Sequence, residues 1–173
     1  TIDMGDLRLT DSGERLFVMS GDEKVRVYDS THTQETERGG VRNFSITKDG
    51  SSMVLTSDVG LTKVFNRDDT SWSQLGHVIT TDMTGGGATV DIKNDGTSIV
   101  LTGSSDSLRL YKYDDSSWSL ADIASDQYGS SVFITDTNDL ILGNSTNAGS
   151  VKTFEIRGVF QDNAFSAPTL SLN

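Results

Sequence analysis

The sequence predicts an all-β protein, and three observations support this prediction. Apolar and polar residues alternate over short stretches, as in Val90-Asp91-Ile92-Lys93. Residues that form tight turns separate these stretches, as in Asn94-Asp95-Gly96. The acidic residues comprise 20 Asp and only 5 Glu, and Asp favours turns whereas Glu favours helices. Together these features indicate antiparallel strands joined by short turns.

The best-defined unit runs from Val90 to Ile123 and contains four predicted strands. The first spans residues 90–93, and the Asn94-Asp95-Gly96 turn leads into a second, more apolar strand at 99–101. A third strand carries the alternating apolar residues of 108–113, and a fourth begins at Trp118. This order of short strands and turns predicts a β-meander.

The same unit occurs at least once more in the chain. Residues 44–79 match it without a gap, so that Asp49-Gly50 corresponds to Asp95-Gly96 at an offset of 96 − 50 = 46. An earlier copy begins at Leu7 and has the polar stretch Thr31–Gly39 in place of the tryptophan segment, and a later copy spans 132–156. The equivalent first-strand residues of the four copies are Leu9, Ile46, Ile92 and Ile134.

Repeats of about 40–50 residues with four strands each are typical of β-propeller blades. One small sheet has two faces and cannot bury both, whereas blades stacked around an axis cover each other. We therefore predict a single propeller domain or fragment, with the first strands lining a central channel. Its blades are predicted at about 7–40, 44–83, 90–128 and 132–163. The alternative is a pair of packed antiparallel sheets.

The two ends of the sequence resemble parts of blades. Residues 1–5 resemble 80–84, which follow a fourth strand, and residues 167–173 include a match to 88–92, which open a first strand. Strands from the two termini could close the ring together, or the sequence could be a window on a propeller with more blades. We expect the second arrangement.

The repeat resembles the WD40-like and FG-GAP-like propeller repeats. The resemblance rests on an apolar-x-apolar-x-x-Asp-Gly pattern, an apolar triplet followed by Thr, and a Ser-Trp-Ser segment, seen at 90–102 and 117–119. It covers nearly the whole chain. It implies an extracellular or structural binding platform and implies no particular substrate.

Composition limits the partners. The 173 residues suffice for one domain with a core, and their formal net charge is −11. Such a charge disfavours nucleic acids and anionic membranes as partners. No apolar run approaches the roughly 20 residues that span a bilayer, so we expect no membrane insertion. The absence of Cys excludes disulfides, thiol nucleophiles and thiolate metal ligands.

Acidic pairs recur at equivalent turns of two copies. Asp68-Asp69 and Asp114-Asp115 could supply oxygen ligands to calcium, which requires about 6–8 of them. The simpler interpretation is that they form solvated Asx turns between strands. Calcium is the only cofactor that the sequence suggests.

Two tryptophans, Trp72 and Trp118, stand at matching positions that open the fourth strands. Exposed, they could stack on a sugar or on a partner's side chain. Buried, they would pack between neighbouring blades. Their repetition at a fixed spacing favours packing.

Catalysis is not expected from this sequence. The two histidines, His32 in a polar loop and His77 in a predicted outer strand, belong to no catalytic motif. The glycine-rich stretch 84–87 lacks a strand–loop–helix context with a Lys and is interpreted as a linker between blades. The alternative that two Asp carboxylates act together in glycoside hydrolysis stays open.

Three functional hypotheses follow. The first is a non-catalytic scaffold that binds proteins within a larger cell-surface or virion assembly, favoured by buried tryptophans and an apolar patch on the rim. The second is a carbohydrate-binding propeller, favoured by exposed tryptophans. The third is a fragment of a propeller glycoside hydrolase, favoured by two carboxyls facing each other at the channel mouth. We expect the first, in an extracellular, cell-surface or virion location.

Overall fold

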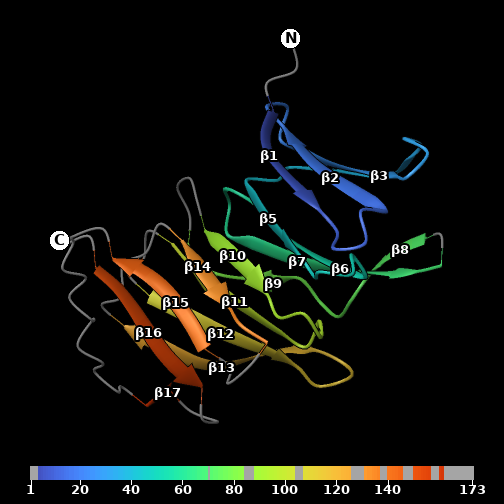
Figure 1. Ribbon diagram of the computed structural model, residues 1–173. Helices are drawn as coiled ribbons and strands as arrows, with labels where there is room; N and C mark the ends of the chain where they lie inside the picture. Colours follow the sequence, from blue (N-terminus) through green and yellow to red (C-terminus); the bar gives the residue numbers. More distant parts are fainter. Residues whose placement is uncertain are drawn as a thin grey trace, which may run out of the picture.

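The protein folds into four antiparallel sheets, one for each copy of the repeat (Figure 1). The computed structural model describes residues 4–69, 71–83, 88–103, 107–125, 131–136, 140–145, 150–156 and 160–161. Sequential strands are neighbours in every sheet, as expected for meanders. We refer to the sheets as blades 1 to 4.

Blade 1 contains β1 (Met4–Leu9), β2 (Arg15–Ser20), β3 (Lys24–Asp29) and β4 (Gln34–Gly39). Blade 2 contains β5 (Asn43–Ile46), β6 (Ser52–Thr56), β7 (Leu61–Asp68), β8 (Ser71–Gln74) and β9 (Ile79–Thr80). Blade 3 contains β10 (Thr89–Ile92), β11 (Ser98–Thr102), β12 (Ser107–Tyr113) and β13 (Trp118–Ser125). Blade 4 contains β14 (Val132–Ile134), β15 (Leu140–Ser145), β16 (Ser150–Ile156) and β17 (Phe160–Gln161).

The turn between the first and second strands has the same construction in blades 2 and 3. Gly50 and Gly96 adopt φ values of 68° and 72°, a left-handed conformation that glycine adopts at little cost. The preceding Asp accepts hydrogen bonds from the residue that follows the glycine; in blade 3, Thr97 donates to Asp95 Oδ1 from its N–H at 2.9 Å and its Oγ1 at 2.6 Å. The Asp-Gly pair is therefore a structural turn.

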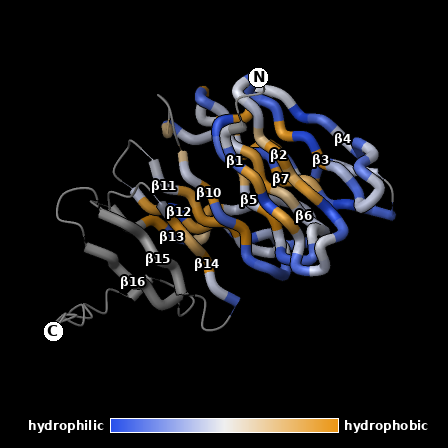
Figure 2. Tube along the Cα trace, turned by 45° about the horizontal axis from the view of Figure 1, so that its top comes forward, coloured by the Kyte–Doolittle hydropathy of each residue, from blue (hydrophilic) through white to orange (hydrophobic). Residues whose placement is uncertain are grey.

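Apolar cores lie between adjacent sheets, and Figure 2 shows hydrophobic residues concentrated along the facing strands. All five residues of β6 and all five of β11 are buried, because the second strand of each of these blades is covered on both faces. The core between blades 1 and 2 consists of Phe17, Val25, Val27, Val41, Phe44, Met53, Leu55, Phe65 and Trp72. The core between blades 2 and 3 includes Val54, Val64, Val90, Ile92, Ile99, Leu101, Tyr111 and Trp118. The core between blades 3 and 4 consists of Val100, Leu108, Leu110, Val132 and Ile134.

The first strands of three blades lie side by side. β10 contacts both β5 and β14, which gathers Ile46, Ile92 and Ile134 in one row as predicted. Blade 1 continues the row through a backbone hydrogen bond of 2.9 Å from Asp11 N–H to the Lys48 carbonyl, but Leu9 itself is 58% exposed. Radial stacking of repeated sheets is thereby confirmed, and a two-sheet sandwich does not describe the structure.

Two details differ from the prediction. The fourth strand of blade 2 is divided, because the chain turns at Gly76 and residues 79–80 pair again with β7. His77 therefore lies in a bend between β8 and β9 instead of in a strand. Met4 and Gly5 belong to β1, where Met4 pairs with Ser20 of β2, so they are not the tail of another blade.

Other predicted segments fall outside the described residues. These are residues 1–3, the glycine-rich stretch 84–87 and the predicted final strand at 167–173. Among the described residues, no helix is long and apolar enough to cross a bilayer.

Candidate functional site

Equivalent residues of successive blades form a hydrogen-bonded row at the end of the first strands. Lys48 donates its backbone N–H to Asn94 Oδ1 at 2.7 Å, and Asn94 donates its own to Asp136 Oδ1 at 3.2 Å. Lys48 Nζ also lies 2.6 Å from Asp136 Oδ2. This ion pair links blade 2 to blade 4 and holds the pKa of Asp136 below its usual range. The row therefore connects neighbouring blades around the axis.

A second carboxylate, Asp91, lies deeper in the same region. Its Oδ1 accepts a hydrogen bond from Ser45 Oγ of blade 2, and its Oδ2 accepts one of 2.8 Å from Ile134 N–H of blade 4. Burial raises the pKa of Asp91, while both hydrogen bonds oppose that shift. Asp91 of blade 3 therefore links blades 2 and 4 to its own blade through hydrogen bonds.

Asp91 and Asp136 line one cavity of about 440 Å³ between the first strands of blades 2 to 4 and the turns that follow them. A glycoside hydrolase would need one of these carboxylates free to donate a proton and the other free to act as base or nucleophile. Here each of the four carboxylate oxygens already accepts a hydrogen bond or ion pair from a neighbouring blade. The two groups have the geometry of structural links.

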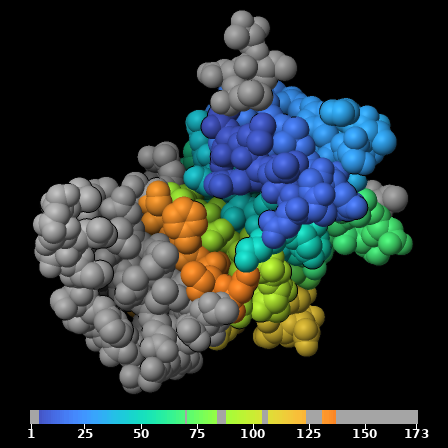
Figure 3. Space-filling view, in the orientation of Figure 1, coloured from blue at the N-terminus to red at the C-terminus, as the bar shows by residue number. Residues whose placement is uncertain are grey.

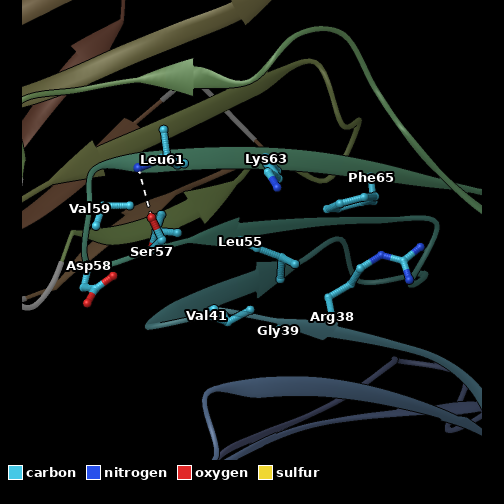
Figure 4. A pocket seen from close by; sticks show the side chains of 12 residues that line it. Arg38, Gly39, Val41, Leu55, Ser57, Asp58, Val59, Leu61, Lys63 and Phe65 are labelled. Atoms are coloured by element: carbon cyan, nitrogen blue, oxygen red, sulfur yellow. Dashed lines mark hydrogen bonds between the residues drawn. The ribbon is translucent and has the colours of Figure 1, made fainter.

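A groove lies between blades 1 and 2, where β4 and the following turn approach β6 and β7 (Figure 4). Its volume is about 270 Å³. Five apolar side chains line it, together with the hydroxyl residues Thr56 and Ser57 and the charged residues Arg38, Asp58 and Lys63. Arg38 is occupied within the protein, because its guanidinium lies over the Phe65 ring at 5.0 Å and donates to the Trp72 carbonyl at 3.2 Å. The apolar and glycine residues that line the groove are Gly39, Gly40, Val41, Leu55, Val59, Leu61 and Phe65.

Blade 2 differs from blade 1 at one position that lines this groove. In blade 1, Arg26 forms an ion pair with Asp22, four residues earlier, at 2.6 Å. At the offset of 50 − 13 = 37, Lys63 of blade 2 corresponds to Arg26, but Val59 corresponds to Asp22. Val59 is 60% exposed, and the Lys63 side chain has no hydrogen-bond or ion-pair partner among the described residues.

Blade 3 shows the same position paired. There Arg109 stands at the equivalent of Lys63, since 63 + 46 = 109, and its guanidinium contacts the carboxylate of Asp82. Of three equivalent cations, only Lys63 lacks an acidic partner in the described structure, and it lines the same groove as the exposed Val59. The aligned repeats carry no clear signal for this site, because blade 3 has Ser105 at the position of Asp22 and its Arg109 contacts Asp82, which lies elsewhere in the repeat.

The two tryptophans predicted as possible ligand platforms are buried. Trp72 is 9% exposed and packs edge-on against Phe17 of blade 1, with ring centroids 5.9 Å apart. Trp118 is 3% exposed and donates its indole N–H to the Leu75 carbonyl of blade 2 at 3.0 Å. Both rings are buried, as the sequence favoured, and the alternative of exposed stacking surfaces does not describe them. Packing between blades explains their repetition.

The acidic pairs predicted as possible calcium ligands form turns. Asp114 Oδ1 accepts hydrogen bonds from the backbone N–H groups of Ser116 at 3.4 Å and Ser117 at 3.0 Å, and these bonds lower its pKa. Asp69 and Asp115 adopt positive φ values of 47° and 66°, which Asp tolerates in turns. Asp68 also ends its strand at such a turn. In the part of the chain that the structure describes, no three acidic or His side chains are grouped as metal ligands.

Comparison with known proteins defines the fold. No family model and no curated protein matches the sequence. Among solved structures, the β-propeller domain of Cps50 (Swd1) from Myceliophteria thermophila shares 11% identity at a TM-score of 0.71, over 90% of this chain and 51% of that one. The chain has a β-propeller fold. The WD40-like resemblance drawn from the sequence is confirmed at the level of architecture.

Other solved structures show the same relationship. A putative 6-phosphogluconolactonase from Bacteroides uniformis shares 14% identity at a TM-score of 0.73, over 95% of this chain and 54% of that one. Hydrazine synthase from Kuenenia stuttgartiensis shares 17% identity at a TM-score of 0.65, over 89% of this chain and 46% of that one. This propeller chain thus spans about half the length of the structures that it matches.

Proposed function

We propose that this chain is a non-catalytic propeller module that binds other proteins through the groove between blades 1 and 2. One observation carries the proposal: Lys63 lacks an acidic partner in the described structure and lines a groove with five apolar side chains, at a position where blades 1 and 3 both pair their cation with an acid. Exposed Val59 stands at the position of Asp22, the acid that pairs with Arg26 in blade 1. A partner that supplies a carboxylate and an apolar side chain would satisfy both residues.

The size and shape of the groove define the partner more closely. A cavity of about 270 Å³ is near the lower end of the roughly 300–1,000 Å³ of small-molecule pockets. It accommodates one large apolar side chain, with the rest of a peptide lying across the surface. Interfaces of this kind gain most of their binding energy from a few buried anchors. We therefore infer a short acidic and hydrophobic segment of a partner protein as the ligand.

The cavity between the first strands of blades 2 to 4 supports a function without catalysis. Its two carboxylates, Asp91 and Asp136, are engaged in contacts between blades. The burial of Trp72 and Trp118 supports protein binding over sugar binding. We place the module in a larger cell-surface or virion assembly, where the net charge of −11 would keep it soluble and steer its encounters.

A random peptide library displayed on phage tests the proposal. Selection on the 173-residue chain should enrich peptides that combine Asp or Glu with a large apolar residue. Synthetic versions of these peptides should bind Lys63→Glu and Val59→Asp at least about tenfold more weakly, a change of about 1.4 kcal/mol. Lys112→Glu is the matched control, because Lys112 is an exposed cation of blade 3 outside the groove, and it should bind like the wild type.

Two results would overturn the proposal. One is enrichment of peptides without acidic residues. The other is binding that Lys63→Glu and Lys112→Glu weaken equally, which would indicate a general effect of charge and no specific groove.

A further inference from the structure

The charged residues of the groove between blades 1 and 2 are separated along its length. The groove continues the core between these two blades, whose close contact is visible in Figure 3. Asp58 lies at one end of the groove in Figure 4, and Lys63 and Arg38 lie further along it, beyond Leu61. The strands explain this order, because Asp58 is in the turn before β7, whereas Lys63 is the third residue of β7.

This separation of charge is a change from blade 1. There the acid Asp22 precedes Arg26 by four residues and forms an ion pair with it at 2.6 Å. In blade 2 the acid is one position earlier, at Asp58, and the exposed Val59 takes the place of Asp22. Asp58 and Lys63 form no ion pair with each other in the described structure. Blade 2 therefore has both charges of the blade 1 pair but holds them apart.

The Asp58 carboxylate is accessible to a ligand. Its side chain is 50% exposed, and the cation nearest to it is Arg42, at 3.7 Å. Arg42 lies closer to Glu23, at 3.0 Å, so that one guanidinium serves two carboxylates and one negative charge remains in excess at this end of the groove. The turn itself does not require an acid, because Gly21 stands at the equivalent position of blade 1. The groove thus presents an acid at one end and the unpaired cation Lys63 further along.

We propose that the groove selects partner segments that carry a basic residue as well as an acidic one, on opposite sides of the apolar anchor. This inference rests on the proposed function of the groove and specifies its ligand. The acid of the segment pairs with Lys63, and its base pairs with Asp58. In an extended peptide, side chains two residues apart point the same way and are about 7 Å apart. The expected pattern is therefore basic-x-apolar-x-acidic, read in either chain direction. A segment with acids on both sides would be rejected by Asp58, because like charges oppose binding.

A double-mutant cycle tests this inference on the peptides selected with the wild-type chain. Replacing the base of such a peptide by Ala should weaken its binding to the wild type at least about fivefold, but its binding to Asp58→Asn by less than about twofold. Asp58→Asn keeps the size of the side chain, and Arg42 retains Glu23, so far-UV circular dichroism should be unchanged. In the reversed pair, Asp58→Lys should bind the peptide with Glu in place of its base more tightly than the original peptide.

Asp115→Asn is the matched control, because Asp115 is an exposed acid in a turn of blade 3 outside the groove. It should bind each peptide like the wild type, and equal losses in Asp58→Asn and Asp115→Asn would mean a general effect of charge and overturn the inference. Selected peptides without a base would also overturn it, as would a base that contributes equally to the binding of wild type and Asp58→Asn. In these cases a loss of binding in Lys63→Glu would still support the proposed function. Conversely, binding that depends on Asp58 but not on Lys63 would overturn the proposed function alone.

Discussion

Trp72 and Trp118 occupy the same position of the repeat, and both are buried against the preceding blade, but their surroundings differ. The indole N–H of Trp118 has a neutral acceptor, the Leu75 carbonyl, at 3.0 Å. That of Trp72 faces the Glu35 carboxylate at 3.5 Å. Glu35 also forms ion pairs with Arg15 at 3.3 Å and with Arg67 at 3.1 Å. The repeat therefore specifies the apolar contact, whereas each interface satisfies its polar groups with its own residues.

Removing either ring should have the largest effect on stability. Trp118→Ala and Trp72→Ala should each lower the free energy of unfolding by about 3–5 kcal/mol, because a large buried side chain leaves a cavity. Urea unfolding followed by far-UV circular dichroism measures this change. A loss below about 1 kcal/mol, typical of surface substitutions, would show that the rings do not hold the blades together.

The charged interface can be broken separately. Glu35→Ala should cost about 3 kcal/mol, because the Glu35 side chain is only 11% exposed and its loss leaves Arg15 and Arg67 without a counter-charge. Glu23→Ala is the control, since Glu23 pairs with Arg42 at the exposed surface and should cost less than about 1 kcal/mol. Equal losses in the two variants would contradict the distinction between the interfaces.

Substitution of two glycines tests how closely the loop between β8 and β9 packs on Trp118. Gly76 and Gly40 have φ values of 69° and 70°, so Ala at either position adopts a left-handed conformation that costs about 1–2 kcal/mol. A Cβ at Gly76 would lie 3.0 Å from Trp118 Cδ1, whereas one at Gly40 would meet nothing within 4 Å. Gly76→Ala should therefore be the more destabilising substitution in urea unfolding. The reverse order would mean that the loop at Gly76 moves freely away from Trp118.

The smallest expected effect concerns pH. Burial raises the pKa of Asp91 above its ordinary value of 3.8, so the folded state holds a proton that the unfolded state releases first. The stabilisation from Asp91 is therefore complete below pH 3.8 and decreases as the pH rises toward its folded pKa. Asp91→Asn should accordingly gain stability relative to the wild type as the pH increases through this window.

Asp136→Asn should change the pH dependence of stability in the opposite direction. The pKa of Asp136 is lowered by Lys48, so its contribution is present above 3.8 and is lost as the pH falls through the folded pKa. Urea unfolding of both variants over a pH series checks the two slopes. Parallel slopes would contradict the assignment of different environments to these two carboxylates.

Local patterns were sufficient to predict most of the fold. Strand alternation and Asp-Gly turns correctly located the four strands of blade 3, and the offset of 46 placed Trp72 and Trp118 at equivalent positions. The row of Ile46, Ile92 and Ile134 followed from the need of each sheet to cover two faces. The divided fourth strand of blade 2 was not predicted, because the turn at Gly76 is stabilised by contacts with Trp118 and Tyr113 of the next blade.

The functional residues were less predictable than the strands. The sequence pointed to tryptophans and paired acids because they recur, and the structure uses Trp118 in a core and Asp114 in a turn. Lys63 stands out only in the structure, because its equivalents Arg26 and Arg109 form ion pairs with acids at different positions of the repeat.

The sequence by itself determined the unit that repeats, its turns and the positions that are apolar, because these depend on residues close together in the chain. Only the tertiary structure decided which polar group meets which. Those outcomes depend on residues tens of positions apart, such as Asp91 with Ile134 or Glu35 with Arg67, which are brought together only when the blades stack.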